Sequence, residues 1–277
     1  MMGTPLAAEY PAPPESPRRR RLVLWLVVVA LILVIATVVA IALLGVGESK
    51  DDGAAPSGLP TGAPPASTGE DGYLPDTVDR YGQQIRVPRD PAGLPLLQTP
   101  PKVDREVNDP ATGVQWQRVY EFGAALFSTS DGPTSINTDG LAQGISHTPQ
   151  GSVIAASQII ARAYFGPTQV RQTVMTQQVI GPDSAKAMVL DLDMPARQYA
   201  IDRFARVDPQ YSDTFSRVSL ASGPKTSSEY PSGQYYGVTT LTMVWDQGQW
   251  KWRIPDDGFT NATADTRVES VVGWAQW

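Results

Sequence analysis

The 277-residue chain contains no cysteine and a single histidine, His147. The lack of cysteine excludes a disulfide framework, a thiol nucleophile and every metal site built on thiolate ligands. One histidine cannot form a multi-histidine metal site within one chain, so any catalytic imidazole must be His147. We therefore expect no catalytic, cofactor-binding or metal-binding residues in this sequence.

Positive charge is also scarce. The 22 basic residues are outnumbered by 28 acidic ones, which gives a formal net charge of −6. Binding to nucleic acid grows with the number of phosphates that lysine and arginine neutralise, so this balance disfavours direct nucleic-acid binding. Residues 101–277 carry 14 basic and 18 acidic side chains, and from that balance we expect this part to present no basic face.

One hydrophobic run stands out against this composition. Leu22 to Val46 is 25 residues long and has no charged side chain. As a helix it would extend about 37 Å, more than the roughly 30 Å of a bilayer core, which predicts a transmembrane helix in contact with membrane lipid. Arg18 to Arg21 precede the run and acidic residues follow it. The positive-inside bias then places residues 1–21 in the cytoplasm and the remainder outside, in a single-pass protein of the cell membrane.

A cleaved signal peptide is the alternative interpretation of the same run. Ala40-Ile41-Ala42 resembles a cleavage site of small residues, and the arginines would form the basic leader. However, the apolar stretch before Ala40 is longer than the usual h-region of about 7–15 residues. An uncleaved anchor is therefore the favoured interpretation.

Residues 47–100 are rich in proline and small residues and poor in large apolar ones. Such a segment buries too little surface to offset its chain entropy, which predicts an extended, mostly disordered tether. Its last third, Tyr73 to Leu97, has scattered apolar residues that would allow it to dock on the domain. We expect the folded, extracytoplasmic domain to cover residues 101–277.

Helical signals occupy the middle of that domain. The segment TPQG at 148–151 predicts a helix start, because threonine caps free N–H groups and proline fits the first helical position. Apolar residues then recur at helical spacing up to Gly166 and give one apolar face. A second helix is predicted over 168–179. A third begins at Asp183 as its cap and ends before Asp208, with a kink near Met194 because Pro195 lacks a backbone donor.

Alternating apolar residues predict strands on both sides of these helices. The strongest β signal is a hairpin whose turn covers 246–249 and whose returning strand carries Trp250, Trp252 and Ile254. The last segment, Val268 to Trp277, is apolar enough to pack back on the domain. The other predicted strands are Val114 to Tyr120, Ala124 to Ser128, Thr214 to Ala221 and Tyr236 to Trp245.

This order predicts an α+β domain that resembles the cone-shaped fold of nuclear transport factor two, in which helices pack on a curved antiparallel sheet. SHTPQGSVIAASQIIAR at 146–162, GPT at 132–134 and VVGWAQW at 271–277 resemble a family of actinobacterial membrane-anchored proteins of integrative conjugative elements, whose domain has no known function. The layout is also similar to the bitopic scaffold subunits of conjugative type IV secretion channels. The resemblance implies other membrane-complex subunits, and a second copy of this chain, as partners.

Few residues in the sequence suggest a catalytic or ligand-binding role. Some enzymes of the cone fold use a His/Asp pair, and Asp139 precedes His147 by eight residues, but a loop or capping hydrogen bond is the favoured role for His147. Asp191 and Asp193 point in different directions on a helix and form no carboxylate pair. Asp256-Asp257-Gly258 lacks the spaced ligands of a calcium loop. For Trp245, Trp250 and Trp252, core packing is favoured over an interface.

The sequence therefore predicts a non-enzymatic membrane scaffold or accessory subunit of a conjugative transfer apparatus. Two alternatives remain open: an accessory subunit of a lipid import system of the mammalian-cell-entry type, and a small-molecule enzyme or sensor that uses the cone pocket. A polar pocket that holds His147 and Asp139 would favour the enzyme or sensor. A pocket filled by tryptophan and aliphatic side chains would favour the scaffold.

Overall fold

The computed structural model describes residues 72–192, 201–255 and 266–277. They belong to one compact unit, Pro64–Trp277. The predicted tail 1–21, the predicted membrane helix 22–46 and the start of the predicted tether lie outside the described residues. Among the residues that are described, no helix has the length and apolarity needed to cross a bilayer.

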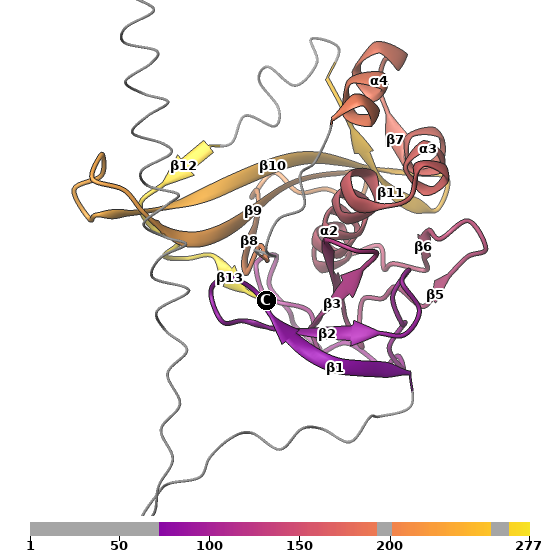
Figure 1. Cartoon of the computed structure of the whole chain (residues 1–277), viewed down its shortest axis with the longest axis horizontal. Helices are drawn as coiled ribbons and strands as arrows, with labels where there is room; N and C mark the ends of the chain where they lie inside the picture. The colour runs from indigo at the N-terminus through magenta and orange to yellow at the C-terminus, as the bar shows by residue number, and fades with distance from the viewer. Residues whose placement is uncertain (1–71, 193–200, 256–265) are drawn as a thin grey trace, which may run out of the picture. The chain divides into compact units, whose positions relative to one another are not determined.

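The domain is an α+β arrangement of three helices packed with mixed sheets (Figure 1). The smaller main sheet has the order β1-β2-β3-β4, and its strands are antiparallel except for the parallel pair β2 and β3. Its strands are β1 Tyr73–Val78, β2 Gln84–Pro88, β3 Gln115–Val119 and β4 Gly123–Phe127.

The larger sheet has the order β13-β8-β9-β10-β11-β7, with β12 paired to β10. The long hairpin of β9 and β10 extends well past the helices (Figure 1). A separate two-stranded sheet consists of β5 Ser135–Ile136 and β6 Ala142–Gln143. The strands of the larger sheet are β7 Val179–Ile180, β8 Phe204–Val207, β9 Phe215–Thr226, β10 Gln234–Asp246, β11 Gln249–Arg253, β12 Thr266–Val268 and β13 Ala275–Gln276.

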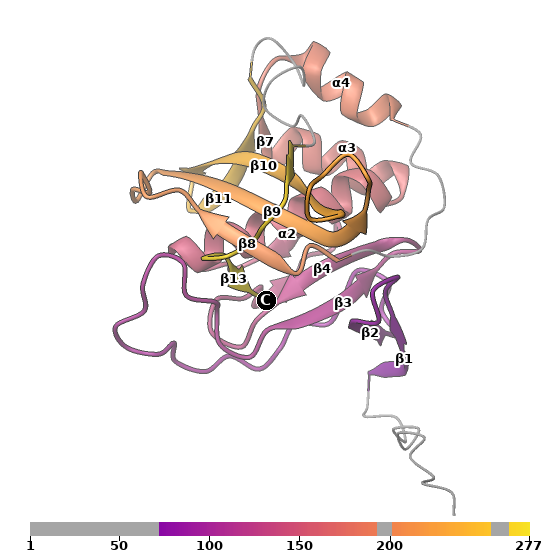
Figure 2. The same ribbon diagram turned by 90° about the vertical axis from the view of Figure 1, so that its left-hand side faces the viewer.

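The helices are α2 Pro149–Phe165, α3 Thr168–Gln177 and α4 Asp183–Asp191. Helix α2 lies between the two main sheets, where it contacts β4 as well as β9 and β11 (Figure 2). Every residue from Gln150 to Ile159 is buried. The spacing in the sequence predicted one apolar face, whereas the helix is enclosed on all sides.

The predicted start of this helix is confirmed. The Thr148 side chain accepts a hydrogen bond of 2.9 Å from the Gly151 N–H, and Pro149 is the first helical residue. A Cβ atom at Gly151 would lie 2.0 Å from the backbone oxygen of Ser146. The glycine of TPQG is therefore required by the close approach of the preceding loop to the helix.

Most of the predicted strands and the second helix are confirmed, including the hairpin of β10 and β11. The C-terminal segment packs back on the domain as predicted: β13 pairs with β8, and the Trp116 indole N–H donates to the Trp277 backbone oxygen at 3.3 Å. The short strands β5, β6, β7 and β8 carried no recognised signal in the sequence.

The third predicted helix is too long. Helix α4 ends at Asp191, Pro182 rather than Asp183 is its N-cap, and Phe204–Val207 forms strand β8. The predicted kink near Met194 lies outside the described residues. Apolar residues at helical spacing led the prediction past the end of α4, while the pairing of β8 with β9 decides the conformation of 204–207.

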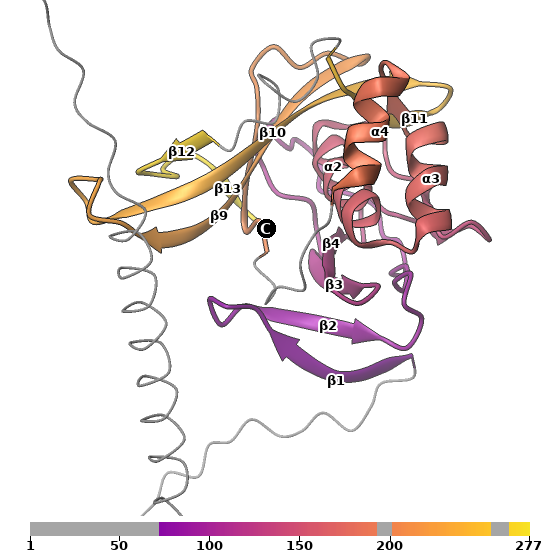
Figure 3. The same ribbon diagram turned by 45° about the horizontal axis from the view of Figure 1, so that its top comes forward.

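Two strands of the domain lie before the predicted boundary at residue 101, within the segment Tyr73 to Leu97 that was expected to dock on the domain. Residues 73–78 and 84–88 form β1 and β2, on the opposite side of the domain from α3 and α4 (Figure 3). Ile85 and Val87 are buried, at 0% and 4% exposure. Pro75 is in the edge strand β1 and Pro88 ends β2, positions where a missing backbone donor is tolerated.

This boundary can be tested with two fragments. Residues 73–277 should unfold cooperatively in urea, whereas residues 101–277 should be less stable by about 3–6 kcal/mol. The loss follows because Ile85 and Val87 each contribute roughly 1.5–3 kcal/mol by burial. Circular dichroism and tryptophan fluorescence would report the two midpoints. Equal midpoints would show that β1 and β2 are dispensable.

Candidate functional site

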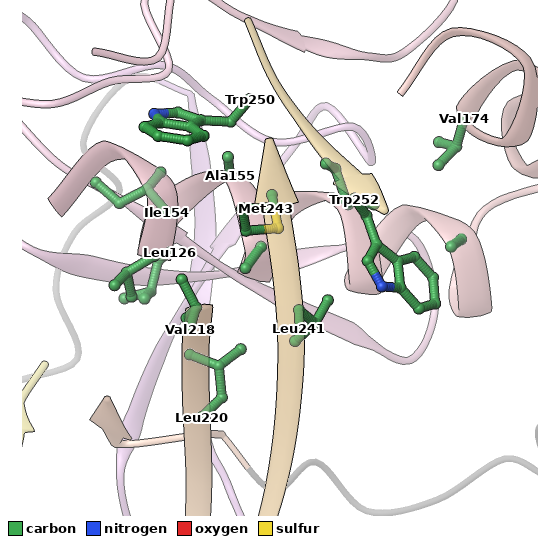
Figure 4. Close-up of a cluster of buried hydrophobic side chains, with 14 of the residues drawn as sticks. Leu126, Ile154, Ala155, Val174, Val218, Leu220, Leu241, Met243, Trp250 and Trp252 are labelled. Atoms are coloured by element: carbon green, nitrogen blue, oxygen red, sulfur yellow. The ribbon is translucent and has the colours of Figure 1, made fainter. Parts of the chain in front are cut away.

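Large apolar side chains fill the space between the larger sheet and the helices. In Figure 4, Met243 and Trp252 of the larger sheet lie close to α2. Trp250 lies next to Ile154 and Ala155, which belong to α2. The exposed fractions of Trp250 and Trp252 are 2% and 1%. The predicted core role of these two tryptophans is confirmed, and Trp245 is half-buried at the margin of the same cluster.

A small cavity lies beside this packing. Beside Trp250, between α2 and the β6 segment, a space of about 40 Å³ is lined by Gln158, Gln178 and apolar neighbours. Ligand pockets usually measure about 300–1,000 Å³, and one water molecule takes about 30 Å³ of liquid. This cavity has room for about one water molecule and not for a small organic substrate.

His147 lies at the surface just before α2. Its ring stacks on Trp245, with ring centroids 3.8 Å apart and an interplanar angle of 8°, and meets Trp250 edge-on at 5.6 Å. Its Nε2 donates a hydrogen bond to the backbone oxygen of Asp213. The imidazole thus connects the loop before α2 to the sheet, which agrees with the favoured local role.

The other candidate residues do not join His147. Asp139 is exposed in the turn between β5 and β6, and no interaction between it and His147 occurs in the described structure. Asp191 is the last residue of α4. No group of three or more His, Asp or Glu side chains suited to a metal is present within the described ranges. Asp193, Asp256, Asp257 and Gly258 lie outside the described residues.

The most highly connected carboxylate is Asp131, whose side chain is fully buried. Arg105 donates to both of its oxygens, at 2.5 and 3.1 Å. Ser130 donates to Oδ2 at 2.5 Å, while Ser146 and Thr148 donate to Oδ1 at 2.7 and 2.8 Å. Thr148 is also the cap of α2, so this single carboxylate ties the 105 loop to the start of the central helix.

These contacts set the ionisation of Asp131. Burial alone would raise the pKa of its carboxyl group, but the hydrogen bonds from Arg105, Ser130, Ser146 and Thr148 together outweigh burial and lower the pKa. The carboxylate is therefore charged at neutral pH. The arrangement leaves no position for a substrate, because the oxygens are occupied by protein donors.

A second buried charge lies further along α2. Arg162 is 0% exposed and donates to the backbone oxygens of Gly140 and Ala92, at 2.8 and 2.7 Å, and to the Gln158 side chain. Burial lowers the pKa of its guanidinium to about 10, so it remains protonated at neutral pH. Arg162 links three separate segments through carbonyl acceptors, and no ion pair with a carboxylate is present among the residues described.

Sequence reasoning missed both centres. Neither Asp131 nor Arg162 was a candidate in the sequence, where only the neighbouring GPT at 132–134 and the helix that contains Arg162 were recognised. A charged residue in a stretch as apolar as VIAASQIIARAYF is one signal that could have pointed to Arg162, because a buried cation needs several acceptors. No local signal links Arg105 to Asp131, 26 residues away.

Comparison with known proteins shows which family the chain belongs to. Residues 82–276 match the family described as Domain of unknown function (DUF8175). The chain belongs to this family. No curated protein and no solved structure matches the chain. The matched range begins between β1 and β2, so it includes part of the region that the sequence had assigned to the tether.

The Asp131 cluster predicts a specific dependence of stability on pH. Because its pKa is lower in the folded state than its ordinary value of 3.8, Asp131 stabilises the fold fully above that value. The contribution is lost as the pH falls through the lower, folded-state pKa. Asp131→Asn should cost about 3 kcal/mol at pH 7, the range for breaking a buried ion pair. The deficit should shrink in acid.

Urea unfolding of both proteins between pH 7 and pH 2.5 measures this difference. Asp139→Asn is the matched control, because Asp139 is exposed and its carboxylate makes no described contact. We expect this control to follow the natural protein at every pH. A constant deficit for Asp131→Asn down to pH 2.5 would contradict the assignment of the acid sensitivity to Asp131.

Proposed function

We propose that this protein is a non-enzymatic, membrane-anchored scaffold or accessory subunit of a conjugative transfer apparatus. The observation that carries the proposal is the filled interior: Trp250 and Trp252 are buried between the larger sheet and the helices. The cavity of about 40 Å³ beside Trp250 supports the same interpretation. A rigid, solid domain suits a protein that makes contacts on its surface.

We also propose the finer description of the fold, a cone like that of nuclear transport factor two. Three helices on a curved sheet support it, as does the long hairpin of β9 and β10. The link to conjugation comes from the resemblance in sequence, above all from the TPQG helix start. The family match describes a domain of unknown function and names no apparatus.

The position in the membrane is part of the same proposal. Leu22 to Val46 would anchor the chain in lipid, residues 1–21 would remain in the cytoplasm, and the domain would lie outside. The run of 25 uncharged residues and the arginines before it support this topology. Other subunits of the membrane complex, or a second copy of the chain, are the proposed partners.

Histidine replacement tests the absence of catalysis. His147→Asn should change the transfer frequency of the mobile element less than about threefold, because it removes only the hydrogen bond from Nε2 to the Asp213 oxygen and the exposed ring stacked on Trp245. Asn cannot exchange a proton near neutral pH. General acid–base catalysis by His147 would instead require a loss of about 10²–10⁴ in rate. Mating assays beside immunoblots of membrane fractions give both the frequency and the protein level.

Thr148→Ala is the control for lost structure, because it removes both the cap of α2 and a hydrogen bond to Asp131, at a cost of about 1–3 kcal/mol. A fall in transfer that follows the protein level in both variants would reflect stability alone. A hundredfold fall for His147→Asn at normal protein level would refute the scaffold in favour of the enzyme or sensor.

Topology is tested with intact spheroplasts. Added protease should digest the domain and leave only a short protected N-terminal fragment, because residues 1–46 are shielded by the membrane and the cytoplasm. Antibodies against residues 1–21 and against the domain would follow the two parts, with a cytoplasmic protein as the control for lysis. Full protection of the domain would contradict the proposed orientation.

A further inference from the structure

The solvent side of the larger sheet gathers three arginines. The face of the sheet toward α2 carries Val218, Leu241 and other apolar side chains. Alternate residues of the same strands point the other way. Among these, Arg206 of β8, Arg217 of β9 and Arg253 of β11 are exposed.

The strand register places the three arginines in two adjacent rows. In one row, Arg206 is opposite Ser219, which is opposite Thr240. In the next row, Arg217 is opposite Thr242, which is opposite Arg253. Arg206 and Arg217 are thus diagonal neighbours at about 7–8 Å, and Arg217 and Arg253 are two strands apart, at about 10 Å.

No carboxylate in the described structure forms an ion pair with these arginines. On the β9 and β10 sides their cross-strand neighbours are Ser219 and Thr242, and Ser219 and Thr240 bond each other at 2.9 Å. On the β8 side Arg217 lies opposite Asp208, whose backbone N–H donates to the Arg217 oxygen at 2.9 Å. The guanidinium of Arg206 lies 4.8 Å from the centre of the Trp274 ring. Asp208 is nearby, but its Oδ1 accepts from the Gln210 backbone N–H.

A groove lies at the centre of this basic sheet face. It has a volume of about 230 Å³ and opens to solvent. This is below the usual 300–1,000 Å³ of a small-molecule pocket, so it suits one side chain better than a whole ligand. The residues that matter for its chemistry are Arg206, Arg217, Asp208, Ser219, Thr240 and Trp274.

The basic sheet face corrects the expectation that residues 101–277 present no such surface. Their balance of charge is negative, yet folding brings three arginines, which form no ion pair among the described residues, to one side of one sheet. Like charges held side by side repel each other, which disfavours the folded state. An anionic partner would relieve this repulsion and would gain hydrogen bonds from the planar guanidinium groups.

We propose that the basic sheet face, Arg206, Arg217 and Arg253, binds an extended acidic segment of a partner protein. An extended peptide presents side chains on one face about every 7 Å, which matches the diagonal spacing of Arg206 and Arg217. One of its carboxylates enters the groove between these two arginines. This surface does not depend on the proposed role in conjugation.

Two other anions fit less well. A single inorganic oxyanion cannot engage both Arg206 and Arg253, whose strands are about 14 Å apart. Duplex DNA carries a charge about every 1.7 Å, and a protein with a net charge of −6 repels such a dense polyanion. An acidic peptide has a lower charge density and a flexible backbone that follows the curved sheet.

Peptide binding to the full-length protein in a nonionic detergent tests the proposal. The probe is a labelled ten-residue peptide of alternating Glu and Ser, and the comparison peptide has Gln in place of Glu. Fluorescence anisotropy should show at least about tenfold tighter binding of the acidic peptide at low salt. The double variant Arg217→Glu with Arg253→Glu should lose about tenfold or more in affinity, because it places like charges against the peptide.

The matched control is Arg89→Glu with Lys102→Glu, two exposed residues outside the larger sheet that give the same change in net charge. It should stay within about twofold of the natural protein. Arg217→Gln with Arg253→Gln should give an intermediate loss and keeps the test valid if the charge reversal prevents folding. Equal losses in test and control variants would overturn the proposal. So would binding of inorganic phosphate or of a DNA duplex, but not of the peptide, through the same arginines.

Discussion

The enclosure of helix α2 between two sheets is the constraint on which the rest of this domain depends. A helix buried on every side must find a protein partner for each polar group that it carries. Ser157 accepts a hydrogen bond from the Leu126 N–H at 3.0 Å, and Gln158 donates to the Leu126 oxygen at 2.6 Å. The helix thereby completes the free edge of β4 with side chains in place of another strand.

The same constraint explains the two buried charges. Asp131 fixes the start of α2 through Thr148, and Arg162 fixes its last turns to the loops at Ala92 and Gly140. Each is held by several protein partners, which limits the cost of removing a charge from water. In an active site, polar side chains of this kind would have to be free to bind a substrate. Here their polar atoms form hydrogen bonds with other groups of the protein.

Much of the fold could be predicted because short stretches of sequence determine its main helices and strands. The TPQG start needs only a cap, a proline and a glycine within four residues, and the hairpin of β10 and β11 needs only alternation around a turn. Strands β1 and β2 were not predicted, because both are short and lie in a segment whose overall composition is rich in proline. Strand β8 was not predicted, because its conformation depends on its pairing with β9.

The candidate sites were harder to predict for a related reason. The favoured local role of His147 agrees with its hydrogen bond to the Asp213 backbone oxygen. The basic sheet face could not be found from composition, since a count of charges contains no information on which residues share a face. Once the register of β8 to β11 is known, alternation along each strand is enough to place the three arginines together.

The arm formed by β1 and β2 also has a mechanical consequence. Among the described strands, β1 is at the edge of its sheet and pairs with β2 alone. It is fastened there by the ion pair of Arg86 and Asp76 at 3.0 Å and by the Arg86 guanidinium over the Tyr73 ring at 4.2 Å. A force that reaches the domain through the chain before Tyr73 therefore loads this strand first. Since β1 pairs with β2 alone, β1 can detach under tension while Ile85 of β2 remains in the core.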